Sequence, residues 1–204
     1  MITIYNFARG ARGLRVIWQC EEMGLAYRLE TLPFPTPASY RALNPLGSVP
    51  YLEDDDGGAA MSESVAMMLY LTHRYGPTPL LPQGDPKTLA TILQWTVFSE
   101  ATFGAALGPL MAARFMAPEA DKDNWSVRAQ GGRVQQALAY LSDSLGDGPW
   151  LAGPDLTLAD IAVSTGLAMW QGALDGALPD RLAAYQARVA DRPAYQRARA
   201  AGQG

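Results

Sequence analysis

The sequence contains little of what metal sites, disulfide frameworks and nucleic-acid-binding surfaces need. Among its 204 residues there are one cysteine, one histidine, 16 lysines and arginines, and 20 aspartates and glutamates. The single cysteine, Cys20, excludes an internal disulfide and provides no cysteine cluster for a metal. The net charge of −4 argues against a nucleic-acid-binding protein, which would carry a clustered basic surface. No run of about 18 apolar residues occurs, so we expect no transmembrane helix and no membrane partner.

The remaining composition is that of an ordinary globular protein, with 49% hydrophobic and 18% charged residues. The N-terminus lacks the basic and apolar segments of a secretion signal. Cys20 lies in an apolar run beside Trp18 and is interpreted as a buried structural thiol. These features predict a cytoplasmic protein in a reducing compartment.

Two halves of different character are predicted. In residues 1–76, strands and helices alternate in the order βαβαββα, which predicts an α/β layer. The strand patterns cover 2–5, 26–32, 49–52 and 59–61, and the helical patterns cover 14–23, 38–43 and 63–75. Residues 77–86 are rich in proline and glycine and predict a linker. Residues 87–204 show helical patterns only, with a bend expected at 104–109 in the first long helix, where glycines and Pro109 occur.

The segment from residue 44 to residue 64 carries the most specific pattern. Asn44-Pro45 and Leu46-Gly47 are turn dipeptides, and Val49-Pro50 begins a short apolar strand. The acids at 53–56, followed by two glycines, predict a solvated hairpin turn. Ser62 is the candidate N-cap of the next helix.

This segment resembles the glutathione-binding half of the cytosolic glutathione transferases. That half carries an NPxGxVP turn, a β-hairpin and an ESxAIxxYL helix start, and this chain has NPLGSVP at 44–50 and ESVAMMLYL at 63–71. Further on, Thr157 and Asp160 resemble the capping box of the family's helical domain. The resemblance covers nearly the whole chain. It implies a thioredoxin-like domain in residues 1–76, a helical-bundle domain in 87–204 that contributes the electrophile pocket, and a homodimer.

The resemblance also implies where glutathione binds. A cis bond in the Val49-Pro50 pair would turn the Val49 backbone toward an extended peptide, a strand-addition mode of capture. Glu63 and Ser64 would hold the γ-glutamyl end, because a helix N-terminus favours an anion. Arg41 would meet a carboxylate of glutathione. Ser48 is also a candidate contact, but it stands where the family often has lysine, which implies a weaker hold on the glycine carboxylate.

The group that activates the glutathione thiol is less clearly marked. A free thiol titrates near pH 8.5, so a neutral-pH thiolate needs nearby donors or positive charge. The family places a tyrosine, serine or cysteine just after the first strand, but no serine, threonine or cysteine lies between Tyr5 and Arg15, and the usual serine or cysteine position falls near Gly10. One hypothesis is that the Tyr5 hydroxyl donates to the thiolate. The other is that Arg9, Arg12 or backbone N–H groups at the helix start stabilise it by charge.

The predicted activity is therefore transfer of the glutathione thiolate to a hydrophobic small-molecule electrophile. Glutathione is the co-substrate, and no metal is expected. A glutathione-dependent isomerase, dehalogenase, lyase or peroxidase on the same fold is an alternative, as is a non-catalytic glutathione-binding module. Fold-level analogy does not decide among these.

Overall fold

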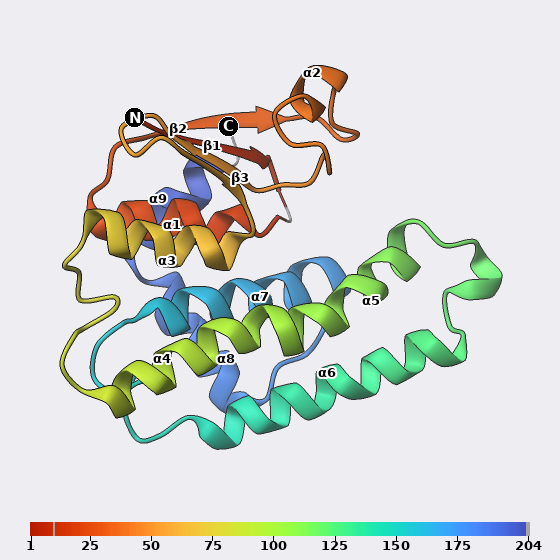
Figure 1. Cartoon of the computed structure of the whole chain (residues 1–204). Helices are drawn as coiled ribbons and strands as arrows, with labels where there is room; N and C mark the ends of the chain where they lie inside the picture. The colour runs from red at the N-terminus through yellow and green to blue at the C-terminus, as the bar shows by residue number, and fades with distance from the viewer. Residues whose placement is uncertain (10, 203–204) are drawn as a thin grey trace. The chain divides into compact units, whose positions relative to one another are not determined.

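The computed structural model describes residues 1–9 and 11–202. Strands and helices alternate from residue 2 to residue 75: β1 (Ile2–Phe7), α1 (Gly13–Met23), β2 (Tyr27–Leu32), α2 (Ala38–Arg41), β3 (Tyr51–Asp54), β4 (Ala59–Ser62) and α3 (Ser64–Tyr75). The rest is helical: α4 (Pro86–Phe98), η1 (Ser99–Gly104), α5 (Ala105–Phe115), η2 (Glu119–Asp121), α6 (Trp125–Ser144), α7 (Leu158–Leu174), α8 (Asp180–Ala190) and α9 (Pro193–Ala201). The predicted α/β half followed by a helical half is confirmed (Figure 1).

The chain divides into two compact units. One comprises Met1–Pro82 together with the segment that begins at Val189, and the other comprises Gln83–Arg188. No helix in the described residues combines the length and apolar character needed to cross a bilayer.

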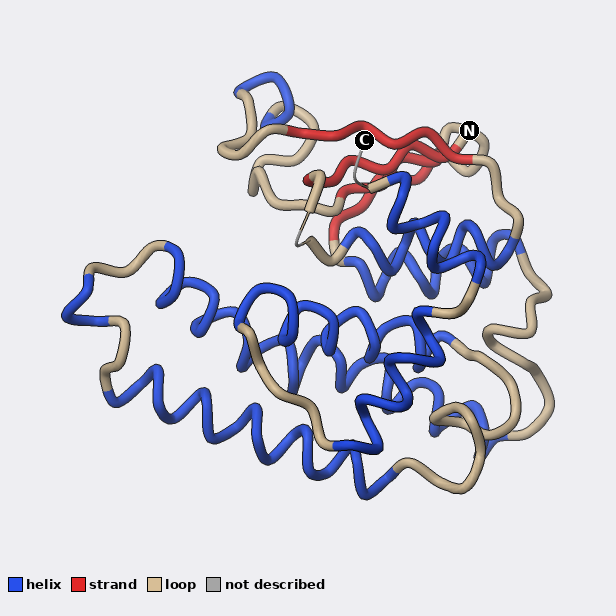
Figure 2. Tube along the Cα trace, turned by 180° about the vertical axis from the view of Figure 1, so that it is seen from behind, coloured by secondary structure: helices blue, strands red, loops and turns tan. Residues whose placement is uncertain are grey.

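In the first unit, a four-stranded sheet of order β2-β1-β3-β4 is covered on one face by α1 and α3 (Figures 1 and 2). β1 pairs in parallel with β2 and antiparallel with β3, and β3 pairs antiparallel with β4. Ile4 lies opposite Leu52 in the register, and both side chains are fully buried. Because side chains alternate across a sheet, Tyr5 lies on the face opposite to that of Ile4.

The hairpin differs from the prediction at its acidic end. Strand β3 begins at Tyr51 rather than Val49 and continues to Asp54, so the interpretation of residues 53–56 as a solvated turn is wrong for its first two members. Asp54 is only 1% exposed and accepts hydrogen bonds from the hydroxyls of Tyr70 (2.7 Å) and Tyr75 (2.8 Å). These donors come from α3, so no local pattern in the hairpin could reveal them.

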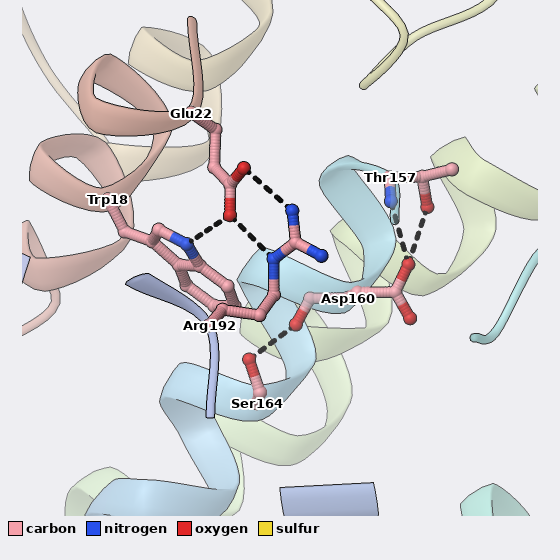
Figure 3. A network of polar contacts seen from close by, with 6 residues as sticks. All are labelled: Trp18, Glu22, Thr157, Asp160, Ser164 and Arg192. Carbon is pink, nitrogen blue, oxygen red and sulfur yellow. Dashed lines mark hydrogen bonds and ion pairs between the residues drawn. The ribbon is translucent and has the colours of Figure 1, made fainter. Parts of the chain in front are cut away.

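The first unit is completed by α9, which packs against α1. Arg192 donates through Nε and Nη2 to the two carboxylate oxygens of Glu22, at 2.7 and 2.8 Å (Figure 3). Glu22 also accepts from the indole N–H of Trp18 at 2.8 Å, and the Trp18 and Tyr195 rings meet edge to face at 4.8 Å. Cys20 is buried in α1, which confirms its interpretation as a structural thiol.

The first long helix of the second unit is interrupted earlier than predicted. η1, over Ser99–Gly104, is π-helical, and the Ala105 N–H donates to the Glu100 carbonyl five residues back. Pro109 lies within α5, downstream of this irregularity. The helical hydrogen-bond pattern therefore changes at 99–104, whereas the predicted bend at 104–109 stays a prediction.

The predicted capping box at the start of α7 is confirmed, and Asp160 serves more partners than a cap requires. Its Oδ2 accepts from the Thr157 N–H (2.8 Å) and hydroxyl (2.9 Å), as drawn in Figure 3. Its Oδ1 accepts from the Leu151 N–H (2.9 Å) and the Tyr185 hydroxyl (3.0 Å). Asp160 thus joins three separate segments of the second unit (hereafter the helical unit) through one fully buried carboxylate.

We expect Asp160→Ala to lower the free energy of unfolding by about 3 kcal/mol or more, because several buried donors lose their acceptor at once. A helix cap alone is worth only about 0.5–2 kcal/mol. Urea denaturation measures the change. Asp155→Ala, at an exposed position just before the box, is the matched control and should change stability little. Equal losses of unfolding free energy in Asp160→Ala and Asp155→Ala would contradict the role given to the Asp160 carboxylate.

Candidate functional site

The loop before β3 holds one peptide group in a defined orientation. The Val49–Pro50 bond is cis, as the resemblance implies. The Ser48 carbonyl accepts from the Tyr40 hydroxyl at 2.6 Å and from the Asn44 side-chain amide at 2.8 Å. In a planar trans peptide unit, the carbonyl and the N–H point in opposite directions. Fixing the Ser48 carbonyl therefore also fixes the direction of the Val49 N–H.

The Val49 backbone is available to a ligand. Within the described residues, neither its N–H nor its carbonyl forms a hydrogen bond with another protein group. The register places Tyr51 opposite Ser62, so Val49 and Ser64 each lie two residues beyond that pair. Both therefore lie at the same end of the β3–β4 hairpin.

The turn that precedes this loop is held from two sides. Gly47 has a φ of 63°, a conformation that favours glycine. Its carbonyl accepts from the Thr36 hydroxyl at 3.1 Å. Arg41, the last residue of α2, lies over the turn, because a Cβ at Gly47 would come within 3.2 Å of the Arg41 Nε. The exposed Ser48 follows, and its hydroxyl accepts from Asn44 at 3.3 Å.

The start of α3 is open toward this end of the hairpin. The N-cap is Glu63 rather than Ser62, and it has a φ of 74° and provides no side-chain cap. The first helical bond runs from the Met67 N–H to the Glu63 carbonyl at 3.0 Å, so the N–H groups of residues 64–66 have no intrahelical acceptor. The buried Ser64 hydroxyl accepts from Nη1 of Arg15 at 3.3 Å.

Positive charge gathers at the start of α1. Arg15 is 1% exposed, and its pKa is lowered to about 9, first by burial and then by the nearby charge of Arg12. Arg12 occupies the N-cap position of α1, where the helix dipole adds to the positive potential. Arg9 is exposed in the preceding loop. The position near Gly10, where the family often has serine or cysteine, lies outside the described residues.

The Tyr5 hydroxyl has a hydrogen-bond partner within its own sheet. Its hydroxyl donates to the carboxylate of Glu53 on β3 at 2.7 Å. Burial, and secondly this hydrogen bond, raise the pKa of Tyr5 to about 12. Its ring lies 5.6 Å from that of Tyr40 and 6.1 Å from that of Tyr51. Tyr5 therefore belongs to a packed aromatic cluster on the sheet face away from α1.

Two functional candidates were missed in the sequence. Arg15 was signalled only by a charged residue inside the apolar run 14–20. Tyr40 gave no signal, because its role depends on a loop that folds back eight residues later. Among the described residues, no three His, Cys, Asp or Glu side chains gather into a group that could hold a metal ion.

Comparison with known proteins points to one family. Residues 12–74 match the model of the glutathione S-transferase N-terminal domain, and residues 107–197 match that of the C-terminal domain. The glutathione S-transferase GstA of Escherichia coli O157:H7 is 32% identical over 77% of this chain and 75% of its own length. The disulfide-bond oxidoreductase YfcG of Escherichia coli K12 is 27% identical over 95% of this chain and 92% of its own length.

A solved structure gives the same result. The theta-class enzyme of Xanthomonas axonopodis pv. citri, determined with glutathione bound, superposes with a TM-score of 0.80 at 31% identity. The superposition covers 97% of this chain and 96% of that chain.

We expect Tyr5→Phe to lower the free energy of unfolding by about 1–2 kcal/mol at pH 8, because the Glu53 carboxylate loses a donor. The pKa of Tyr5 is about 12 in the folded protein and about 10 when unfolded, so this stabilisation is complete below pH 10 and is lost as the pH rises toward 12. Urea denaturation of both proteins at pH 8 and pH 11 measures the difference. A difference that does not shrink at the higher pH would refute the assignment.

Proposed function

The chain belongs to the glutathione S-transferase family, and from this premise we propose that it binds extended glutathione along Val49 and transfers its thiolate to an apolar electrophile. The observation that carries the proposal is a convergence at one end of the hairpin. There the Val49 backbone, the Ser64 hydroxyl and the Arg15 guanidinium lie together.

The γ-glutamyl end of the tripeptide is assigned to the start of α3. Its carboxylate accepts from Ser64 and from the open N–H groups of α3, where the helix dipole favours an anion. Arg15 lies directly behind Ser64 and adds positive charge in a buried setting. Glu63 provides a carboxylate for the α-ammonium group of the same end.

The extended pose of glutathione also assigns its cysteinyl residue and its glycine carboxylate. The cysteinyl backbone pairs with the N–H and carbonyl of Val49, beside Pro50, in the manner of an added strand. The glycine carboxylate then lies toward Ser48 and Arg41, both exposed beside the 45–47 turn.

We propose that positive charge, and not a tyrosine hydroxyl, stabilises the glutathione thiolate. The Tyr5 hydroxyl already donates to Glu53, whereas Arg12 and the N-terminus of α1 present the cation and dipole that lower a thiol pKa. Arg9, three residues before Arg12, adds to the same positive potential.

The helical unit supplies apolar surface for the electrophile. Phe115 and Met116 are 62% and 75% exposed, whereas Trp95 and Phe103 are buried in its core. We assign electrophile contact to the exposed pair. We also propose the homodimer that is usual in the family, which sedimentation velocity tests.

A second candidate activity is disulfide reduction by bound glutathione, because the relative YfcG is named a disulfide-bond oxidoreductase. The thiolate of bound glutathione would attack the disulfide and release one thiolate, and a second glutathione would resolve the mixed disulfide. Cys20 does not contribute a redox thiol, because burial raises its pKa to about 12. Parallel assays with a chromogenic aryl halide and with a small disulfide separate the two activities.

We expect Arg12→Gln to raise the thiol pKa of bound glutathione by about one unit, because an opposite charge near the thiolate is removed. The thiolate ultraviolet absorbance, titrated with saturating glutathione, measures this pKa. Tyr5→Phe should leave it unchanged. Arg28→Gln, which removes an exposed arginine paired with Glu30 on β2, is the matched control. A shift in Tyr5→Phe without one in Arg12→Gln would reverse the assignment.

Removing one hydrogen-bond donor from the Ser48 carbonyl should weaken glutathione binding. We expect Tyr40→Phe to raise the Kd for glutathione about three- to tenfold, because one of two donors that orient the Val49 N–H is lost. Isothermal titration measures the Kd. Tyr27→Phe, which removes a tyrosine hydroxyl bonded to Glu21 at the edge strand, is the control. Equal Kd values in both variants would show that the Ser48 carbonyl does not position the ligand.

A further inference from the structure

The proposed glutathione site has so far given no role to Gln19, a polar residue inside the first unit. Its side chain is 0% exposed, as are those of Ile17 and Cys20 in the same helix. Its Nε2 donates to the Met68 carbonyl of α3 at 2.9 Å and to the sulfur of Met23 at 3.5 Å. Its Oε1 is buried, and no described residue donates to it. The amide therefore makes one close contact with another helix and leaves its own oxygen unsatisfied.

Stability alone does not explain an amide at this position. A buried oxygen without a donor destabilises a protein, whereas an apolar side chain of similar size would fill the same space without that penalty. Rotating the amide by 180° is no remedy, because it would place Oε1 against the Met68 carbonyl oxygen, and both atoms are acceptors. Residues that break such a local rule are expected mainly at functional sites. The contact with α3 therefore points to a purpose of Gln19 beyond filling the core.

A second hydrogen bond between α1 and α3 runs beside the first. Nη1 of Arg15 donates to the Ser64 hydroxyl at 3.3 Å, and both bonds join residues 49 positions apart. Arg15 and Gln19 are about one helical turn apart on α1. Ser64 and Met68 have the same spacing on α3, so each pair lies on one helix face. The two helices therefore run in the same direction where they meet, and Figure 1 shows them side by side.

The bond to Met68 holds the position of α3 along α1 without involving the ligand. It ends on a backbone carbonyl, whereas the Arg15 bond ends on the Ser64 hydroxyl, which is assigned to the γ-glutamyl carboxylate. A slip of α3 by one residue would shift it about 1.5 Å along its axis and turn its face by about 100°. Such a slip would carry the Ser64 hydroxyl and the open N–H groups of 64–66 away from Val49. Binding sites need their groups held within about 0.5 Å of the productive geometry.

We propose that Gln19 is a positioning residue for glutathione: by holding the Met68 carbonyl, it places Ser64 and the start of α3 at the γ-glutamyl end of the ligand. Because Gln19 is fully buried, it acts through α3 and does not touch the ligand itself. This role rests on the proposed glutathione site, which the affinity of the unaltered chain tests separately.

Isothermal titration of the full chain with glutathione tests this role. We expect Gln19→Leu to raise the Kd about tenfold, since α3 loses its fixed position. Its midpoint in urea should be unchanged or higher, because a buried unpaired oxygen is removed and the Met68 carbonyl keeps a helical N–H as its donor. Gln19→Met, which keeps the length of the side chain without the donor, should behave in the same way.

Gln186→Leu is the matched control. Gln186 also donates to a backbone carbonyl, that of Ser164 at 3.1 Å, and its buried Oε1 likewise has no donor among the described residues, but it lies in the helical unit. Its replacement should leave the Kd for glutathione unchanged. γ-Glutamylcysteine, which lacks the glycine residue, should lose the same factor as glutathione in Gln19→Leu, because the affected contacts lie at the γ-glutamyl end.

An unchanged Kd in folded Gln19→Leu, or an equal rise in Gln186→Leu, would overturn the positioning role and leave the proposed function standing. So would a loss seen with glutathione and absent with γ-glutamylcysteine, which would place the change at the glycine end. Failure of both Gln19 variants to fold, judged by circular dichroism, would show a structural role and overturn the proposal. Absence of glutathione binding by the unaltered chain would instead refute the proposed function, and this role with it.

Discussion

The geometry of the candidate site depends on the two hydrogen bonds that the Ser48 carbonyl accepts. Two donors, from Tyr40 and Asn44, converge on one oxygen, and the rigid peptide plane transmits their hold to the Val49 N–H. The same antiparallel register that builds the sheet places Ser64 beside this group. The candidate site therefore combines the hairpin and its turn with groups from α1, α2 and α3.

Each unit contains a buried carboxylate that accepts hydrogen bonds from another element of the same unit. Asp54 receives hydroxyls from α3, and Asp160 receives groups from three segments of the helical unit. A buried carboxylate without such partners would be strongly disfavoured. These two acids therefore link segments that the chain order keeps apart.

The sequence predicted what is decided locally. The turn at 44–50 and the Thr157–Asp160 box depend on residues within a few positions of one another, so their patterns are visible in one dimension. The Tyr5–Glu53 hydrogen bond was not predictable, because it joins strands 48 residues apart. Nor was the π-helical segment at 99–104, since apolar residues predict a helix there but not the spacing of the hydrogen bonds within it.

The packing of α9 against α1 has a consequence for how the chain matures. Glu22 meets its partner Arg192 170 residues later in the chain, and Trp18 meets Tyr195 in the same later segment. On the ribosome, the sheet and its first helices emerge long before the segment that covers α1. The first unit therefore remains without α9 while the whole of segment 83–188 is synthesised, and a product terminated within that segment would lack part of a unit whose strands were already made.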